Sequence, residues 1–145
     1  MTNIWIVVAD EARAKILSTE KASGLPHAVD ELISTEANML NQELVSDKAG
    51  RSFDSAGQGR HGVGEKDDPK DQVAKRFAKE VGTYLDMKRQ GGLYTKLIIV
   101  AAPRFLGKLR KSLTDGVSEL VSLEIDKDLT KLGPQEIREH LPKYL

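Results

Sequence analysis

Cysteine is absent from this sequence, and neither sign of charge is in excess. Without cysteine there are no disulfides, no thiolate metal sites and no thiol nucleophiles, and the absence fits a reducing compartment. The 22 basic residues equal the 22 acidic residues in number. No overall field therefore indicates a nucleic-acid or membrane partner, and any basic surface must be local.

Long hydrophobic runs are also missing. The apolar run from Ile4 to Ala9 follows no basic segment and ends at Asp10 and Glu11. It is too short for the hydrophobic region of a signal peptide and far too short to cross a bilayer. We therefore expect a cytoplasmic protein without a membrane partner.

The 145 residues that are present, 39% hydrophobic and 30% charged, suit one globular domain with its own core. The β-branched run 4–9 predicts a strand covered on both faces, and the alternation over 12–16 predicts an antiparallel partner. Residues 31–36 suggest a third strand. A helix is predicted over 69–90, where Asp68 can cap the first turn and apolar residues repeat at helical spacing.

The second half of the chain alternates strands and helices. A buried strand at 97–102 is followed by a helix from Pro103, a half-exposed strand at 121–125 and a short helix after Gly133. The order of elements predicts that residues 1–145 form a single α/β domain. We expect a three-layer-like arrangement around a mixed, mainly five-stranded sheet.

Residues 41–68 carry five glycines and almost no apolar periodicity, which predicts a long glycine-rich loop. Within it, Gly57 to Gly62 formally satisfies the pattern GxGxxG. A dinucleotide site would need this pattern to follow a buried strand and to open a helix at once. No strand pattern precedes it, and the acids Glu65, Asp67 and Asp68 would repel a phosphate. We therefore expect no nucleotide cofactor.

Five stretches of the sequence are distinctive: GRSFDS at 50–55, GRH at 59–61, AAPRFLGKLR at 101–110, EIDKDLT at 124–130 and IREHL at 137–141. In these stretches the chain resembles the family of proteins required for attachment to host cells. This bacterial family is in turn similar to the central, RNase H-like domain of archaeal and eukaryotic release factors and of Pelota-type rescue factors. The resemblance implies that fold, and it implies a ribosome or a tRNA as the partner.

In release factors the loop carries Gly-Gly-Gln, which positions water on the peptidyl-tRNA ester. The corresponding segment here is 59–64, and the glutamine is missing from its place, since Gln58 lies before it. The resemblance therefore favours a translation-associated binding protein over a peptidyl-tRNA hydrolase. Gln58 and His61 are the candidates in the loop for any residual catalysis.

Cations in and near the loop are suited to contact RNA phosphates, and an aromatic ring or His61 to stack on a base. A second basic cluster on the predicted helix from Pro103 has no acid before Ser112; it consists of Arg104, Lys108, Arg110 and Lys111, and all but Arg110 share one face. The binding candidates are Arg51, Phe53, Gly59, Arg60, His61, Gly62, Arg76, Arg104, Lys108 and Lys111. Three simpler interpretations stay open: a flexible, solvated loop, a Phe53 side chain that anchors the loop to the domain, and an ordinary polar helix face.

Two other functions also stay open. Asp10, at the end of the first strand, is where an RNase H-like nuclease would keep a metal-binding carboxylate, and two-metal chemistry needs further acids to converge there. Asp10 also has a structural explanation, because an aspartate in a tight turn hydrogen-bonds the local backbone. The three histidines lack zinc-ligand spacing, so we expect no metal. The last alternative is a protein-interaction module that affects attachment indirectly.

Overall fold

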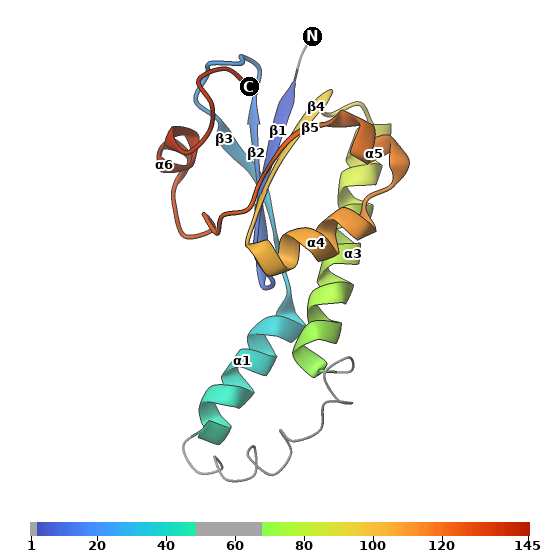
Figure 1. The fold of residues 1–145 in the computed structure, drawn as a ribbon, viewed down its shortest axis with the longest axis vertical. Coiled ribbons are helices and arrows are strands. Elements are labelled where there is room, and N and C mark those ends of the chain that lie inside the picture. The colour runs from blue at the N-terminus through green and yellow to red at the C-terminus, as the bar shows by residue number, and fades with distance from the viewer. Residues whose placement is uncertain (1–2, 49–67) are drawn as a thin grey trace.

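A five-stranded sheet with the strand order β3-β2-β1-β4-β5 forms the centre of the molecule (Figure 1). The structure is a computed structural model that describes residues 3–48 and 68–145, the side chains of 43–48 excepted. The strands are β1 Ile4–Ala9, β2 Arg13–Thr19, β3 His27–Ile33, β4 Lys96–Ala101 and β5 Val121–Ile125. The helices are α1 Thr35–Lys48, α3 Pro69–Gln90, α4 Pro103–Ser112, α5 Asp115–Leu120 and α6 Pro134–Glu139.

The sheet is mixed, as the sequence predicts. β1 runs antiparallel to β2 and parallel to β4, which is in turn parallel to β5. The pairing of β1 with β4 is continuous from Ile4 opposite Lys96 to Ala9 opposite Ala101. Every residue of β1 is buried, because the strand lies in the middle of the sheet and side chains that alternate between the two faces are covered on both.

Both faces of the central strands are covered, which gives three layers, whereas the edge strand β3 is largely exposed (Figure 1). On one face Val7 and Ile99 pack against Phe77 of α3 and Phe105 of α4. On the other face the C-terminal segment, including α6, covers the sheet through residues such as Ile137. Each fully buried side chain of this size stabilises the fold by roughly 1.5–3 kcal/mol relative to leaving it exposed.

Helix α3 has the bounds that the sequence predicts, 69–90. The carboxylate of Asp68 accepts a hydrogen bond from the backbone N–H of Lys70 at 3.1 Å, and Pro69 occupies the first helical position. Beyond the helix, Gly92 adopts a φ of 73°, a left-handed conformation that glycine tolerates because it has no Cβ. Local sequence signals therefore determine both ends of this helix.

Two boundaries were predicted wrongly. The third strand was expected over 31–36, but β3 ends at Ile33 and α1 begins at Thr35, because the hydroxyl of Ser34 accepts a hydrogen bond from the backbone N–H of Ala37 at 3.1 Å. The loop was expected to begin at Asn41, but residues 41–48 continue α1. The remaining part of the expected loop, 49–67, lies outside the described residues.

The short helix α5 was not predicted from the sequence. It begins after Thr114, whose side-chain oxygen accepts a hydrogen bond from the backbone N–H of Val117 at 3.2 Å. Six residues are too few for a helical repeat of apolar residues to be recognised. Over the described part of the chain, no helix combines the length and the apolar character needed to cross a membrane.

Candidate functional site

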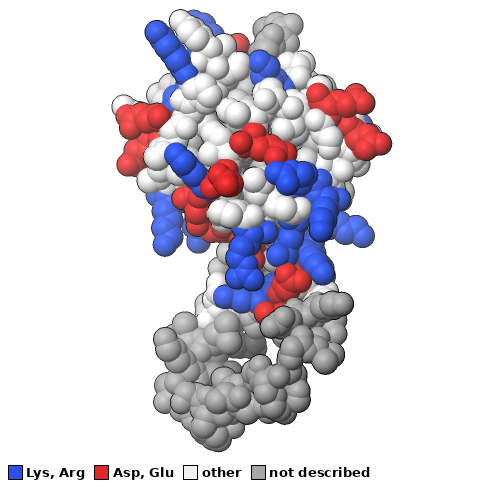
Figure 2. All heavy atoms as spheres, viewed as in Figure 1, with Lys and Arg blue, Asp and Glu red and all other residues white. Residues whose placement is uncertain are grey.

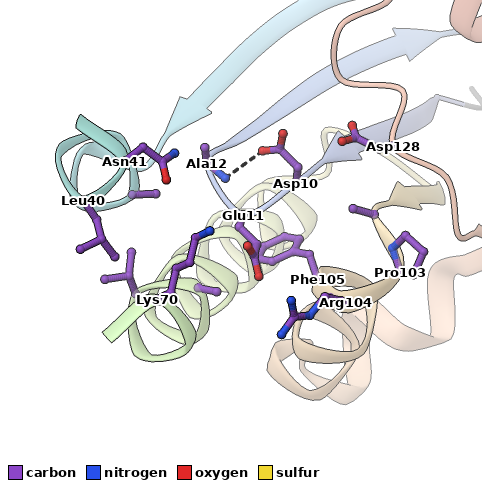
Figure 3. Close-up of a pocket in the computed structure, with 14 residues that line it drawn as sticks. Asp10, Glu11, Ala12, Leu40, Asn41, Lys70, Pro103, Arg104, Phe105 and Asp128 are labelled. Carbon is purple, nitrogen blue, oxygen red and sulfur yellow. Dashed lines mark hydrogen bonds between the residues drawn. The ribbon is translucent and has the colours of Figure 1, made fainter. Parts of the chain in front are cut away.

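A cavity of about 510 Å³ opens where β1 and β4 end (Figure 3). Five segments surround it: the turn after β1, the first turn of α4, the beginning of α3, the first half of α1 and the segment after β5. After β1 the chain turns back into β2, whereas after β4 it leads through α4 and α5 to β5 on the other side. Ligand sites in open α/β sheets usually lie where parallel strands end and the chain diverges in this way.

Asp10 forms one wall of this cavity and stabilises the turn between β1 and β2. Its Oδ1 accepts hydrogen bonds from the backbone N–H groups of Ala12 and Arg13, at 2.8 and 2.9 Å. Its Oδ2 lies 3.2 Å from the hydroxyl of Thr130. The structural explanation for Asp10 that the sequence offered is thus confirmed.

Asp128 lines the same cavity and also contacts Thr130. Its Oδ1 lies 3.1 Å from the backbone nitrogen and 2.7 Å from the hydroxyl oxygen of Thr130. A hydroxyl has a single proton, so at any moment Thr130 donates it to only one of the two carboxylates. Thr130 is buried and connects the segment after β5 to the first turn of the sheet.

The acids that a nuclease would need are partly dispersed. Glu11 lines the cavity with Asp10 and Asp128. Asp30 does not line it, and instead accepts a hydrogen bond from Tyr84 in the second half of α3. Across residues 3–48 and 68–145, no three carboxylates or imidazoles lie close enough together to hold a metal ion. Within that part of the chain, the convergence expected for two-metal chemistry does not occur.

Two cations, Lys70 of α3 and Arg104 of α4, extend into the cavity from the helical side (Figure 3). Among the residues that the structure describes, neither makes an ion pair with a carboxylate. The first turn of α4 also has no side-chain cap at Ala102. Lys111, further along α4, is exposed and is likewise unpaired within the described ranges.

The basic cluster on α4 is less free of acids than its sequence suggested. Lys108 lies 2.9 Å from Asp71 of α3, and this hydrogen bond holds the pKa of the Asp71 carboxyl below its ordinary value. Arg110 pairs with Glu124 of β5. Spacing along one helix does not reveal acids that a neighbouring element supplies, so the prediction of an acid-free patch was wrong for these two cations.

Arg76 is placed away from the cavity. Its guanidinium makes two hydrogen bonds to the Glu36 carboxylate of α1, at 3.1 and 2.8 Å, and these lower the pKa of Glu36. This pair connects α1 to α3. The structure therefore gives Arg76 a structural contact that the sequence did not indicate.

The predicted site residues divide into two sets. Asp10 and Arg104 meet at the cavity, and Lys108 and Lys111 follow Arg104 along α4. The loop candidates lie outside the described residues; they are Arg51, Phe53, Gln58, Gly59, Arg60, His61 and Gly62. Sequence reasoning missed the apolar wall formed by Leu40 and Val73, because α1 and α3 are distant in sequence and no local pattern shows that they approach each other.

These features define an α/β domain with a site at the carboxyl end of its central parallel strands. A domain of the same fold occurs in an archaeal translation termination factor, with a TM-score of 0.51 and 14% sequence identity. The similarity covers 97% of this chain and 35% of the factor, so the chain spans about a third of that protein. The release-factor-like fold is thereby confirmed, and its description as RNase H-like stays a prediction.

The family follows from the sequence itself. Residues 5–141 match the model of the family described as "Protein required for attachment to host cells", and the chain belongs to this family. The assignment confirms the resemblance that the five sequence stretches indicated.

Two further structures show weaker similarity. A PilM–PilN type IV pilus biogenesis complex shares 15% identity over 98% of this chain and 43% of that chain, with a TM-score of 0.41. The Ppx/GppA phosphatase of Aquifex aeolicus shares 11% identity over 86% of this chain and 35% of that chain, with a TM-score of 0.35. Both scores are too low to bear on the function. No curated protein matches the sequence.

Proposed function

We propose that this member of the host-attachment family is a translation-associated factor that binds the RNA of a ribosome or a tRNA. The binding surface, which we call the basic end below, consists of Lys70 and Arg104 at the cavity and of Lys111 further along α4. The proposed function is binding without hydrolysis, because the glutamine of the release-factor loop is missing from its place. It requires the protein to be in the cytoplasm, where ribosomes are.

The observation that carries the proposal is that cations without an ion pair lie at the cavity and along α4. Within the described chain, the residues of the basic end make no ion pair, whereas Arg76, Lys108 and Arg110 are each paired with a carboxylate. Unpaired cations attract phosphates without first giving up a protein partner, and phosphate contacts supply most sequence-independent affinity for nucleic acid. Figure 2 shows lysine and arginine side chains gathered where α4 lies in front of α3.

Two further observations support the proposal. The uncapped first turn of α4 presents backbone N–H groups beside Arg104, a polarity that suits a phosphate oxygen. The fold is also that of a domain of a translation termination factor. The loop cations Arg51 and Arg60 belong to the proposal on the strength of the sequence alone.

The test compares unpaired with paired cations. We expect the double variant Arg104→Ala/Lys111→Ala to bind fluorescent tRNA and to co-sediment with ribosomes more weakly than the wild type. The slope of log K against log salt should become shallower by about 0.7–0.9 for each phosphate that the variant no longer neutralises. The matched control is Arg76→Ala/Arg110→Ala, which removes the same number of charges from paired positions.

Equal losses of affinity in the two double variants would show that net charge alone controls binding, and would contradict the assignment of the basic end. Failure of the wild type to bind either RNA at low salt would contradict the function itself. In that case the interaction-module hypothesis would gain support.

A further inference from the structure

We infer that the cavity at the end of β1 and β4 receives one unpaired nucleotide of the bound RNA, with its phosphate on the cations and its base against the opposite wall. The inference rests on the proposed function and adds to it a preference for single strands and for particular bases. Four properties of the cavity support it: its size, its two-sided charge, its apolar wall and its unused carboxylate acceptors.

The size of the cavity fits a small ligand. At about 510 Å³ it lies within the range of roughly 300–1,000 Å³ that is usual for small-molecule sites. A double helix is too wide to enter it, whereas an unstacked nucleotide in a single strand is free to do so. The cavity therefore distinguishes single strands from duplexes by shape.

The acidic and the basic side chains of the cavity come from different sides of it. Figure 3 shows Asp10 and Asp128 toward the strand ends, Lys70 and Arg104 extending from the helices, and Glu11 between the two groups. A nucleotide has the complementary arrangement, because its phosphate is anionic and the amino groups of adenine, cytosine and guanine donate hydrogen bonds. A simple anion such as phosphate alone would match only one side.

The apolar lining of the cavity comes from the helices. Leu40 of α1 and Val73 of α3, together with Pro103 at the start of α4, line the cavity. Bases that are unstacked from RNA are commonly covered by such side chains, which replace part of the stacking energy. The wall thus gives the base a surface to pack on while its phosphate stays at the cations.

The unused acceptors include Oδ2 of Asp128 and the carboxylate of Glu11, which has no donor within the described residues either. Oδ1 of Asp128 accepts hydrogen bonds from Thr130, but no described residue donates to Oδ2. A carboxylate oxygen favours a base with an exocyclic amino group and disfavours uracil, whose single ring N–H is flanked by two carbonyl oxygens. We therefore expect adenine or cytosine to be preferred over uracil.

The experiment measures the binding of five-nucleotide oligo(A), oligo(C) and oligo(U) and of a short RNA duplex by fluorescence anisotropy at low salt. The wild type should bind oligo(A) or oligo(C) about tenfold more tightly than oligo(U), since a hydrogen bond to a charged group has about that effect. In Asp128→Asn this preference should largely disappear, because the new amide retains Oδ1 and replaces Oδ2 with a donor.

A second variant changes the shape of the cavity without changing its charge. Ala12→Leu places an aliphatic side chain in the cavity and should weaken the binding of oligo(A) about tenfold, while duplex binding stays as in the wild type. Ala28→Leu makes the same change at an exposed position of β3 that does not line this cavity, and should have no effect. Thermal melting curves establish that each variant is folded.

The outcomes are distinct. If all oligonucleotides bind equally and Ala12→Leu has no effect, the nucleotide site is wrong while the basic end remains supported. If AMP binds in the cavity but RNA does not, a free nucleotide is the ligand and the inference is overturned. If neither RNA nor AMP binds, both this inference and the proposed function fail.

Discussion

Asp30 and Tyr84 join the edge strand β3 to helix α3 through a side-chain hydrogen bond of 2.7 Å, in which the Tyr84 hydroxyl donates. This bond is the main reason that the pKa of Asp30 lies below its ordinary value, and the backbone N–H of Glu31 adds to the effect. Burial, followed by the bond to Asp30, raises the pKa of the Tyr84 hydroxyl. The pair therefore favours an ionised Asp30 and a neutral Tyr84.

The variant Tyr84→Phe removes this bond and keeps the ring that stacks on Trp5, at 6.2 Å between centroids. We expect the pKa of Asp30 to rise toward its ordinary value of 3.8, as measured by an NMR titration of its carboxyl carbon. A carboxyl with a lowered pKa in the folded state stabilises the fold above its ordinary pKa, and this contribution is lost as the pH falls through the lowered value. An unchanged titration in the variant would contradict the assignment.

Single residues were predictable where their partners are close in sequence. The cap by Asp68 and the turn bonds of Asp10 involve residues two or three positions away, so the local pattern indicates them. Asp71 and Lys108 come from different helices, and no spacing rule connects them. The same reason explains why the shared contact of Asp10 and Asp128 with Thr130 was not foreseen.

At the scale of elements, the end of α4 approaches α3 closely at Gly82. A Cβ atom at this position would lie 2.5 Å from the backbone carbonyl oxygen of Ser112, well inside van der Waals contact. Backbone atoms of a helix end do not move aside as a flexible side chain does. The packing of these two helices, on which the cavity depends, therefore requires a residue without a side chain here.

We expect Gly82→Ala to lower the free energy of unfolding by about 1–3 kcal/mol, as overpacking does in close-packed cores. The control is Gly107→Ala in α4, where no atom lies within 4 Å of the new Cβ. This control should raise stability by about 0.5–1 kcal/mol, because alanine loses less backbone entropy in a helix. Urea unfolding of both variants measures the difference, and a stabilised Gly82→Ala would contradict the close approach.

The elements themselves were predicted best where burial leaves a regular pattern. Helix α3 buries Val73, Phe77, Val81 and Leu85 at helical spacing, and its bounds were predicted correctly. Helix α1 has no such stripe; among its described side chains only Ala37 is buried. The cap of Ser34 stabilises its first turn but gives no signal further along the helix. Because apolar residues do not repeat at helical spacing in its second half, that half was predicted as part of the loop.

At the scale of the whole molecule, Arg138 connects the last helix to the turn between β2 and β3. Its guanidinium donates to the backbone carbonyls of Gly24 and Ala22, at 3.0 and 3.1 Å. It also donates to those of Pro142 and Lys143, both at 2.6 Å. One side chain thus holds two segments that are distant in sequence.

The variant Arg138→Met should lower the free energy of unfolding by roughly 2 kcal/mol. Hydrogen bonds to a charged group stabilise by about 1.5–3 kcal/mol when they are well shielded, and the Arg138 side chain is only partly shielded from solvent. It should also make the C-terminal residues more sensitive to carboxypeptidase. Arg13→Met is the control, because the Arg13 side chain has no partner within the described chain. Equal stability of the two variants would contradict the role of Arg138.

The parallel pairing of β1 with β4 has a consequence for how the chain folds. Ile4 pairs with Lys96 and Ala9 with Ala101, so the central ladder joins segments from the two ends of a long stretch of sequence. The hairpin of β1 and β2 joins residues that are close in sequence. The other edge of β1, however, has no neighbouring strand until β4 has been synthesised. Such a high contact order slows folding. During synthesis, β1 therefore presents an apolar edge to other chains, and the time spent in that state affects how much protein folds rather than aggregates.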